Sequence, residues 1–237
     1  MTYINAKSKY LINVKNINIK HKFDKLVTKS VSVTDNQVKE CIEYAKKCID
    51  ESKDYKKLVP SSIKDEKLQK QIGEQMIFAQ KIGECGVLNY FKYRGLKPEV
   101  LKSKKIGIKT CIDKGIHNRL IIDKKEFDSN NKENYYIGVH LNLEVEDKKH
   151  PIKKYLVKNL YDIKRVQVYG YLEARFLDSL RYETITKKDG KKEYKFYTKK
   201  ASNYDKKDRY AKIKSECKWY YLDRMMDIEG LVMKIKK

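Results

Sequence analysis

The sequence predicts an α/β fold in which a mixed β-sheet is flanked by helices, with an α+β arrangement of the same elements as the alternative. Two observations predict it: a long helical pattern in the first half of the chain, and four strand-like segments that follow it in one block. Hydrophobic residues make up 41% of the 237 residues, enough for a core. Without an internal repeat or a Pro/Ser-rich linker, we expect a single domain over residues 1–237.

Residues 1–61 form the predicted N-terminal extension of strands and one helix. The stretches YLINV and NINI suit strand pairing, and SVTDNQVKECIEYAKKCIDESK has a helical pattern. Thr34 or Asp35 can cap this helix. Its apolar residues recur at helical spacing, at Val38, Ile42, Ala45 and Ile49.

A longer helix is predicted from about residue 63 to residue 93. It is the first element of the core, which is expected over residues 62–180. Pro60-Ser61-Ser62 breaks the chain and offers a new cap. Gly83 and Gly86 interrupt the apolar stripe and each cost about 1 kcal/mol relative to alanine. A helix tolerates this where its backbone must lie close to a sheet or a ligand. Gly95 is the expected residue just after the helix end.

Four strands are predicted next, and they are KKIGIKTCI, NRLIID, YYIGVHLNLEV and RVQVYGYLEARFL. The fourth is expected to stop at Gly170, and its tail is expected to start a short helix near Leu172. Residues 181–237 then make a basic hairpin, turning at Asp189-Gly190, and a C-terminal segment that packs back on the core.

The net charge of +23 favours binding to polyanions, most commonly the phosphate backbone of DNA. A merely solvated basic surface, in a chain rich in Lys, Ile, Asn and Tyr, is the alternative. Residues 187–218 carry 13 Lys or Arg against 5 Asp or Glu. In the first interpretation the partner is double-stranded DNA, and the basic residues expected to contact it are Lys191, Lys192, Lys195, Lys199, Lys200, Lys206, Lys207 and Arg209.

The cysteines and the hydropathy pattern indicate a location inside the cell. The five cysteines show no CxxC pair, so we interpret them as reduced core thiols and not as a zinc site or a disulfide framework. No apolar run is long enough to cross a bilayer, and the N-terminus is unlike a signal peptide. We therefore expect a cytoplasmic protein of a bacterial host or a phage-infected cell, with no membrane partner.

Several segments, taken together, resemble the PD-(D/E)XK nuclease superfamily. They are FAQKIGECGVLNYFKYRGL, IGIKTC, NYYIGVHLNLEV followed by RVQVYGYLEARFL, and YAKIKSECKWYYLDRMMDIEGL. The resemblance covers roughly residues 62–232 and implies a restriction-endonuclease-like core. It also implies a divalent-metal-dependent endonuclease of phage or mobile-element type that uses Mg²⁺ or Mn²⁺, and many such enzymes form homodimers.

The resemblance implies a catalytic set of Glu84, Glu99 and Lys109. Glu84 matches the acid of the family's helix, and Lys109 matches the motif lysine at a strand end. The acid two residues before that lysine is replaced by Gly107, so Glu84 and Glu99 remain as the metal ligands. We expect Glu84 and Lys109 to converge in one hollow.

The loss of the acid at Gly107 also supports an alternative: a catalytically inactive protein of the same fold. Such a protein would bind DNA or a protein partner as a regulator in phage–host conflict. Other nuclease patterns fit less well. GIH at residues 115–117 and YYIG at residues 135–138 lack the tyrosine of a GIY-YIG enzyme, and the four histidines are dispersed.

Overall fold

The computed structural model describes residues 28–60, 62–112, 119–129, 132–147, 149–150, 152–179, 184–186, 192–197, 210–212 and 217–237. Its elements in chain order are β1 (Lys29–Ser32), α2 (Asp35–Glu51), η1 (Lys53–Leu58), α3 (Glu66–Tyr93), α4 (Val100–Ser103), β2 (Ile106–Ile112), β3 (Arg119–Asp123), α5 (Lys124–Phe127), β4 (Tyr135–Leu141), η2 (Lys153–Tyr155), η3 (Leu160–Asp162), β5 (Arg165–Glu173), α6 (Ala174–Asp178), β6 (Thr184–Thr186), β7 (Lys192–Tyr197), β8 (Tyr210–Lys212), β9 (Cys217–Tyr221), η5 (Leu222–Arg224) and α7 (Ile228–Lys236).

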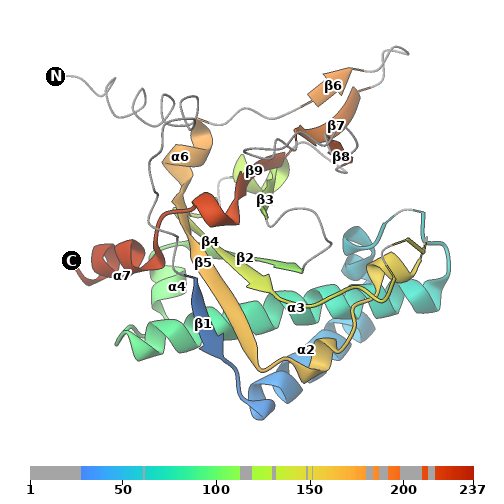
Figure 1. Cartoon of the computed structure of the whole chain (residues 1–237), viewed down its shortest axis with the longest axis horizontal. Coiled ribbons are helices and arrows are strands. Elements are labelled where there is room, and N and C mark those ends of the chain that lie inside the picture. The colour runs from blue at the N-terminus through green and yellow to red at the C-terminus, as the bar shows by residue number, and fades with distance from the viewer. Residues whose placement is uncertain are drawn as a thin grey trace.

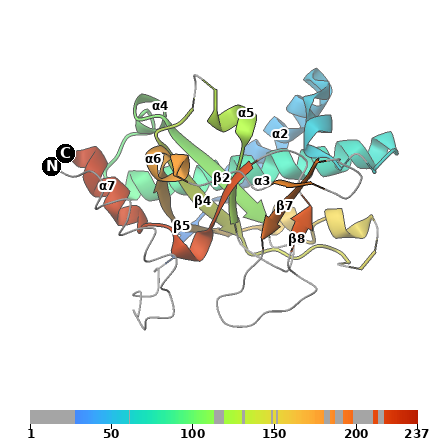
Figure 2. The same ribbon diagram turned by 90° about the horizontal axis from the view of Figure 1, so that it is seen from above.

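A four-stranded mixed sheet with the order β1-β5-β4-β2 forms the centre of the molecule. Strand β2 runs parallel to β4, whereas β5 runs antiparallel to both β4 and β1. Helices α2 and α3 lie along one side of this sheet (Figures 1 and 2). The predicted α/β class with a mixed sheet between helices is therefore confirmed.

One predicted strand lies outside this sheet. Strand β3 pairs with β9 in a separate two-stranded sheet, although residues 124–216 lie between the two strands in sequence. The predicted hairpin appears as the antiparallel pair β6 and β7, whose turn at Asp189-Gly190 lies outside the described residues. The stretches YLINV and NINI also lie outside them.

Helix α2 begins and packs as its sequence predicts. Thr34 is the N-cap, and its side chain accepts a hydrogen bond from the backbone N–H of Gln37, whose own side chain accepts one from the Thr34 N–H. This reciprocal pair satisfies two N–H groups that the first turn leaves without partners. The buried face consists of Val38, Cys41, Ala45 and Ile49.

Helix α3 begins later than predicted, and its cap is Asp65 instead of the Ser61-Ser62 pair. The Asp65 carboxylate accepts from the backbone N–H of Leu68 at 2.6 Å. At the other end, Gly95 follows the C-cap residue with φ of +72°, as predicted for a helix-terminating glycine. Glycine is favoured there because a side chain is strained at positive φ.

The two glycines inside α3 bring its backbone against the sheet. A Cβ added at Gly83 would lie 2.0 Å from Oγ1 of Thr110 in β2. A Cβ added at Gly86 would lie 1.9 Å from Cγ2 of Val166 in β5. Both distances are shorter than any real contact, so of the two reasons predicted for these glycines, the structure shows close approach to a sheet.

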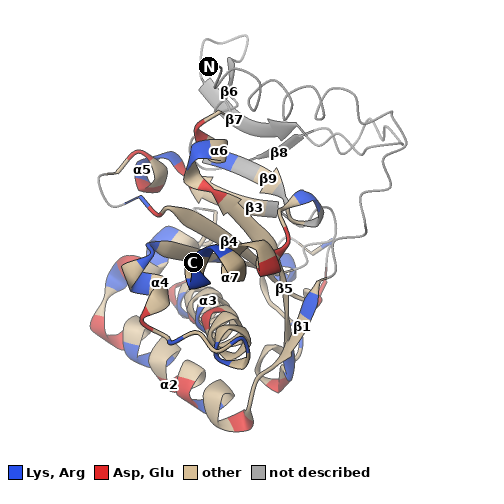
Figure 3. Cartoon of the chain, turned by 90° about the vertical axis from the view of Figure 1, so that its left-hand side faces the viewer, with Lys and Arg blue, Asp and Glu red and all other residues tan. Residues whose placement is uncertain are grey.

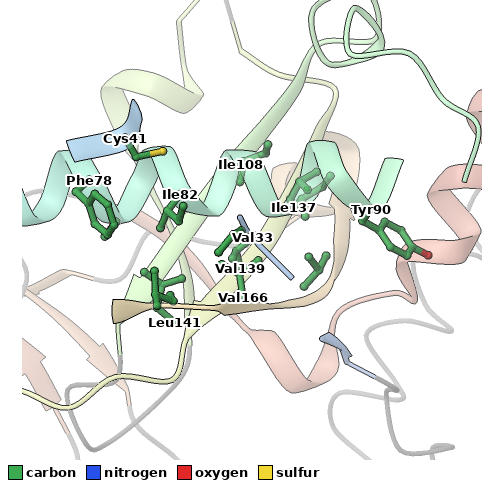
Figure 4. Packing of buried hydrophobic residues seen from close by; sticks show 14 of the residues in the cluster. Val33, Cys41, Phe78, Ile82, Tyr90, Ile108, Ile137, Val139, Leu141 and Val166 are labelled. Atoms are coloured by element: carbon green, nitrogen blue, oxygen red, sulfur yellow. The ribbon is translucent and has the colours of Figure 1, made fainter. Parts of the chain in front are cut away.

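Two buried clusters lie on the two faces of the sheet and give the molecule three layers. The larger cluster joins α2, α3 and α7 to the sheet, and Figure 4 shows Phe78, Ile82 and Tyr90 of α3 with strand residues such as Ile108 and Val166. The smaller cluster joins β3, α5, α6 and η5 to the opposite face, with Tyr136 and Leu172 contributed by the sheet. No helix within the described residues is both long and apolar enough to cross a bilayer.

Candidate functional site

Glu84 lies on α3, where its carboxylate interacts with neighbours on the same helix. Lys81 Nζ lies 3.1 Å from one carboxylate oxygen, and Gln80 Nε2 lies 3.4 Å from the other. The Lys81 ammonium also sits 5.0 Å from the ring centre of Tyr44 in α2. Glu84 is thus half-buried on the helix layer of the molecule, beside α2.

Lys109 points to the other face of the sheet. Its neighbour Thr110 faces α3, because Oγ1 and Cβ of Thr110 are the atoms that a Cβ on Gly83 would meet. Side chains alternate along a strand, so Lys109 must point away from α3. Its Nζ donates to Oε2 of Glu126, in α5, at 2.6 Å.

The expected convergence of Glu84 and Lys109 is therefore wrong. Helices α3 and α5 lie on opposite sides of the sheet, as Figure 3 shows. The physical reason is the period of the strand: the apolar residues Ile106, Ile108 and Ile112 pack toward α3 and turn Lys109 to the opposite face. Glu84 therefore belongs to the helix that packs on one face of the edge strand β2, and Lys109 points to the other face.

Glu99 does not join either residue. It is exposed, immediately precedes the short helix α4 and makes no side-chain cap hydrogen bond there. The structure thus distributes the three predicted catalytic residues over three places: the helix layer, an exposed turn and the opposite face of the sheet.

A different acid occupies the space beside Gly107. Since Gly107 and Lys109 are two residues apart on β2, their positions share one face of the sheet. A Cβ on Gly107 would lie 2.9 Å from Cγ of Glu133 and 3.2 Å from Cδ1 of Tyr136. The side chain of Glu133 therefore fills the volume into which an acid at position 107 would extend.

The parallel pairing of β2 and β4 brings Glu133 to this place. Ile106 pairs with Tyr135, and the backbone N–H of Asn134 donates to the carbonyl of Lys105 at 2.7 Å. Glu133 directly precedes this contact. Neither Glu126 nor Glu133 was identified from the sequence, because Glu126 lies 17 residues from Lys109 and no family motif covers either acid. The sequence signal available was weak: two acids within the ten residues that precede a strand.

The surroundings favour the neutral form of Glu133. Burial raises the pKa of its carboxyl group, and the negative charge of Glu126 raises it further, while Lys105 and Lys109 act in the opposite direction. The repulsion between two carboxylates on one face is the kind of strain that a bound cation relieves. We call Lys109, Glu126 and Glu133 the lysine–glutamate cluster.

Replacing Glu133 with glutamine should stabilise the protein more at about pH 7 than at about pH 4. Because the folded-state pKa of Glu133 is raised, folding favours the protonated form. That stability is complete below the unfolded pKa and is lost as the pH rises through the raised pKa. Glutamine does not ionise, so the melting temperature of the variant should exceed that of the wild type increasingly with pH.

Glu173→Gln provides a control of opposite sign. Burial alone would raise the pKa of Glu173, but hydrogen bonds from Lys234 and Arg175 outweigh it and lower the pKa. The stability from this carboxylate is present above the unfolded pKa and is lost as the pH falls through the lowered one. Glu173→Gln should therefore destabilise most at neutral pH, and equal pH profiles for the two variants would contradict the assignment.

Metal-binding capacity is limited in the described part of the chain. Among these residues, no group of three or more His, Cys, Asp or Glu side chains is arranged to hold a metal ion. The lysine–glutamate cluster offers two carboxylates, which together with substrate phosphate and water match the ligands that Mg²⁺ usually takes. Helices α4 and α5 also carry basic residues (Figure 3).

The basic residues predicted to contact DNA lie outside the part of the chain whose side chains are described. They are Lys191, Lys192, Lys195, Lys199, Lys200, Lys206, Lys207 and Arg209. Comparison with protein-family models, with curated proteins and with solved structures finds no match for the chain.

Proposed function

We propose that this protein is a divalent-metal-dependent DNA endonuclease whose site is the lysine–glutamate cluster. The observation that supports this is the position of Glu133, whose Cγ lies 2.9 Å from the point where the Cβ of a side chain on Gly107 would be. An acid and a lysine then share one face of β2, as in the acid-x-Lys pattern, although the acid comes from the segment before β4. Glu84 and Glu99 have no role in this proposal.

The cluster has the chemical groups that phosphodiester hydrolysis requires. Glu126 and Glu133 would hold Mg²⁺ or Mn²⁺, because these ions prefer oxygen ligands. The bound ion would stabilise negative charge at the phosphate. Lys109, oriented by its 2.6 Å contact with Glu126, places an ammonium group beside the carboxylates, where it can interact with a phosphate oxygen.

The charge of the chain supports a polyanionic substrate. A net charge of +23 and a sequence pI of about 9.6 give a positive potential at neutral pH. This attraction is independent of base sequence. It weakens as the salt concentration rises, because the release of counterions from DNA then contributes less to binding. We therefore expect binding to both plasmid and linear DNA.

Removing the metal should abolish cleavage without abolishing DNA binding. We expect purified protein to nick or linearise supercoiled plasmid with Mg²⁺ or Mn²⁺, and excess EDTA to stop the reaction, because the ion stabilises the developing charge. Gel electrophoresis measures cleavage, and retardation of a labelled duplex measures binding. Cleavage that persists in excess EDTA would contradict the proposed chemistry, and so would the absence of cleavage with both Mg²⁺ and Mn²⁺.

A second function, DNA binding without cleavage, is favoured by the glycine at position 107 itself. An inactive protein of this kind would act as a regulator, alone or through a protein partner. It would retard DNA at low salt and leave plasmid intact with either metal. The two functions are thus distinguished by the same pair of measurements.

A further inference from the structure

Two cysteines from different helices meet in the helix layer. Cys41 in α2 and Cys85 in α3 have their sulfur atoms 3.6 Å apart. Cys41 is 2% exposed and belongs to the large buried cluster, beside the α3 residues Phe78 and Ile82 in Figure 4. Cys85 is half-buried and packs against the same cluster. The more accessible thiol is therefore in contact with a deeply buried one.

The two thiols have different acidities. A hydrogen bond from the Cys41 thiol lowers the pKa of Cys85; burial opposes this shift, and the positive charge of Lys81 adds to it. The same hydrogen bond and burial raise the pKa of Cys41. A thiolate is the nucleophilic form of cysteine, so Cys85 is the residue suited to attack and Cys41 the residue suited to resolve.

We propose that Cys41 and Cys85 are a redox modification site, at which hydrogen peroxide produces a reversible disulfide that joins α2 to α3. The pair lies in the layer of helices, whereas Lys109 points to the opposite face of the sheet. The modification therefore does not depend on the proposed nuclease activity.

The oxidation proceeds in two balanced steps. The Cys85 thiolate attacks one peroxide oxygen, an S–O bond forms, the O–O bond breaks, and hydroxide leaves and takes up the proton that Cys85 released. The Cys41 sulfur then attacks the Cys85 sulfur. The S–S bond forms, the S–O bond breaks, and the departing hydroxide carries the Cys41 proton away as water. The two sulfur atoms lose two electrons, and one peroxide becomes two waters.

The geometry requires only a small movement. The sulfur atoms must approach from 3.6 Å to about 2.05 Å, the length of a disulfide bond. Rotation of the Cys85 side chain toward α2 is the simplest route, since Cys41 is held in the core. The bond would close a loop between residues 44 apart in sequence and restrict the unfolded chain.

The test oxidises the full-length protein with increasing hydrogen peroxide and maps its peptides without reduction. We expect a linked pair of peptides containing Cys41 and Cys85, with the loss of two hydrogen atoms, and reversal by dithiothreitol. The melting temperature should rise by about 5–15 °C on oxidation. Linkage of either cysteine to Cys48 or Cys111 instead, or sulfinic acid at Cys85 with no linkage, would overturn the proposal.

Serine variants make the test specific. Cys41→Ser should stop the linkage and leave sulfenic acid at Cys85, which a dimedone probe detects. Cys85→Ser should stop both. The matched control is Cys48→Ser, also on α2, which should link as the wild type does; failure of this control to link would overturn the proposal. Peptide mapping of the wild type decides the outcome even if a serine variant folds poorly.

Discussion

Replacing Lys109 with methionine should reduce plasmid cleavage by about 100-fold or more. Methionine keeps much of the apolar length of the side chain and removes the ammonium group. A loss of cleavage would therefore be due to the missing positive charge. The contact with Glu126 joins two partly exposed groups, 28% and 39% exposed, and such a pair adds about 1 kcal/mol or less to stability. The variant should therefore melt close to the wild type, and initial cleavage rates measured at saturating metal test the prediction.

Glutamine at position 126 or 133 should give a loss of similar size, since each substitution removes one of the two proposed metal ligands. The matched controls are Glu84→Gln and Glu99→Gln, which change the same chemical group elsewhere and should leave the cleavage rate within a few-fold of the wild type. Loss of cleavage in Glu84→Gln with retention in Glu133→Gln would contradict the lysine–glutamate cluster.

A double variant tests whether Glu133 substitutes for an acid at position 107. In Gly107→Asp alone, the new side chain would collide with Glu133, whose Cγ is 2.9 Å from the Cβ position. Combining Gly107→Asp with Glu133→Ala opens that space and moves the carboxylate back onto β2. We expect the double variant to cleave plasmid at least about tenfold faster than Glu133→Ala, because charge stabilisation is restored. A double variant no more active than Glu133→Ala would show that the two positions are not equivalent.

The sequence identified most of the elements that position this cluster, because their signals are local. Capping by Thr34, the apolar stripe of α3 and the helix end at Gly95 are each determined within a few residues. The alternation along β2 also indicates the face toward which Lys109 points. Ile106, Ile108 and Ile112 lie on one face of the strand, and Lys109, at an odd-numbered position between them, lies on the other.

The remaining features depend on contacts between distant parts of the chain. Strand β3 pairs with β9 instead of joining the main sheet, and no short pattern in either segment specifies a partner at that separation. Glu133 reaches Gly107 only through the parallel register of β2 and β4. A motif search looks for acids at fixed spacing, so an acid supplied by the segment before a neighbouring strand is not found.

Replacing Gly86 with alanine should destabilise the protein by about 2 kcal/mol. In an exposed helix the same change stabilises by about 1 kcal/mol, so the expected sign is reversed. The added methyl would lie 1.9 Å from Cγ2 of Val166, which is completely buried and, being β-branched, has little freedom to rotate. Denaturant unfolding of both proteins measures the difference in free energy.

Gly230→Ala is the matched control, a second helical glycine in a different setting. Its added Cβ would lie 3.4 Å from the Tyr171 hydroxyl, an ordinary contact, and Gly230 is exposed. We expect no loss of stability there, and a gain of up to about 1 kcal/mol. Equal effects at Gly86 and Gly230 would mean that helix propensity, and not the approach of α3 to the sheet, determines both.

A double-mutant cycle locates the cause of the Gly86 effect. Val166→Ala alone should cost stability because it leaves a cavity beneath α3. Combined with Gly86→Ala, the new methyl group occupies part of that cavity, so the double variant should be more stable than the sum of the single effects by about 1 kcal/mol or more. Additive losses would place the strain elsewhere, whereas coupling would identify the contact between Gly86 and Val166 as what fixes the distance between α3 and the sheet. That distance also separates Glu84 from the face that carries Lys109.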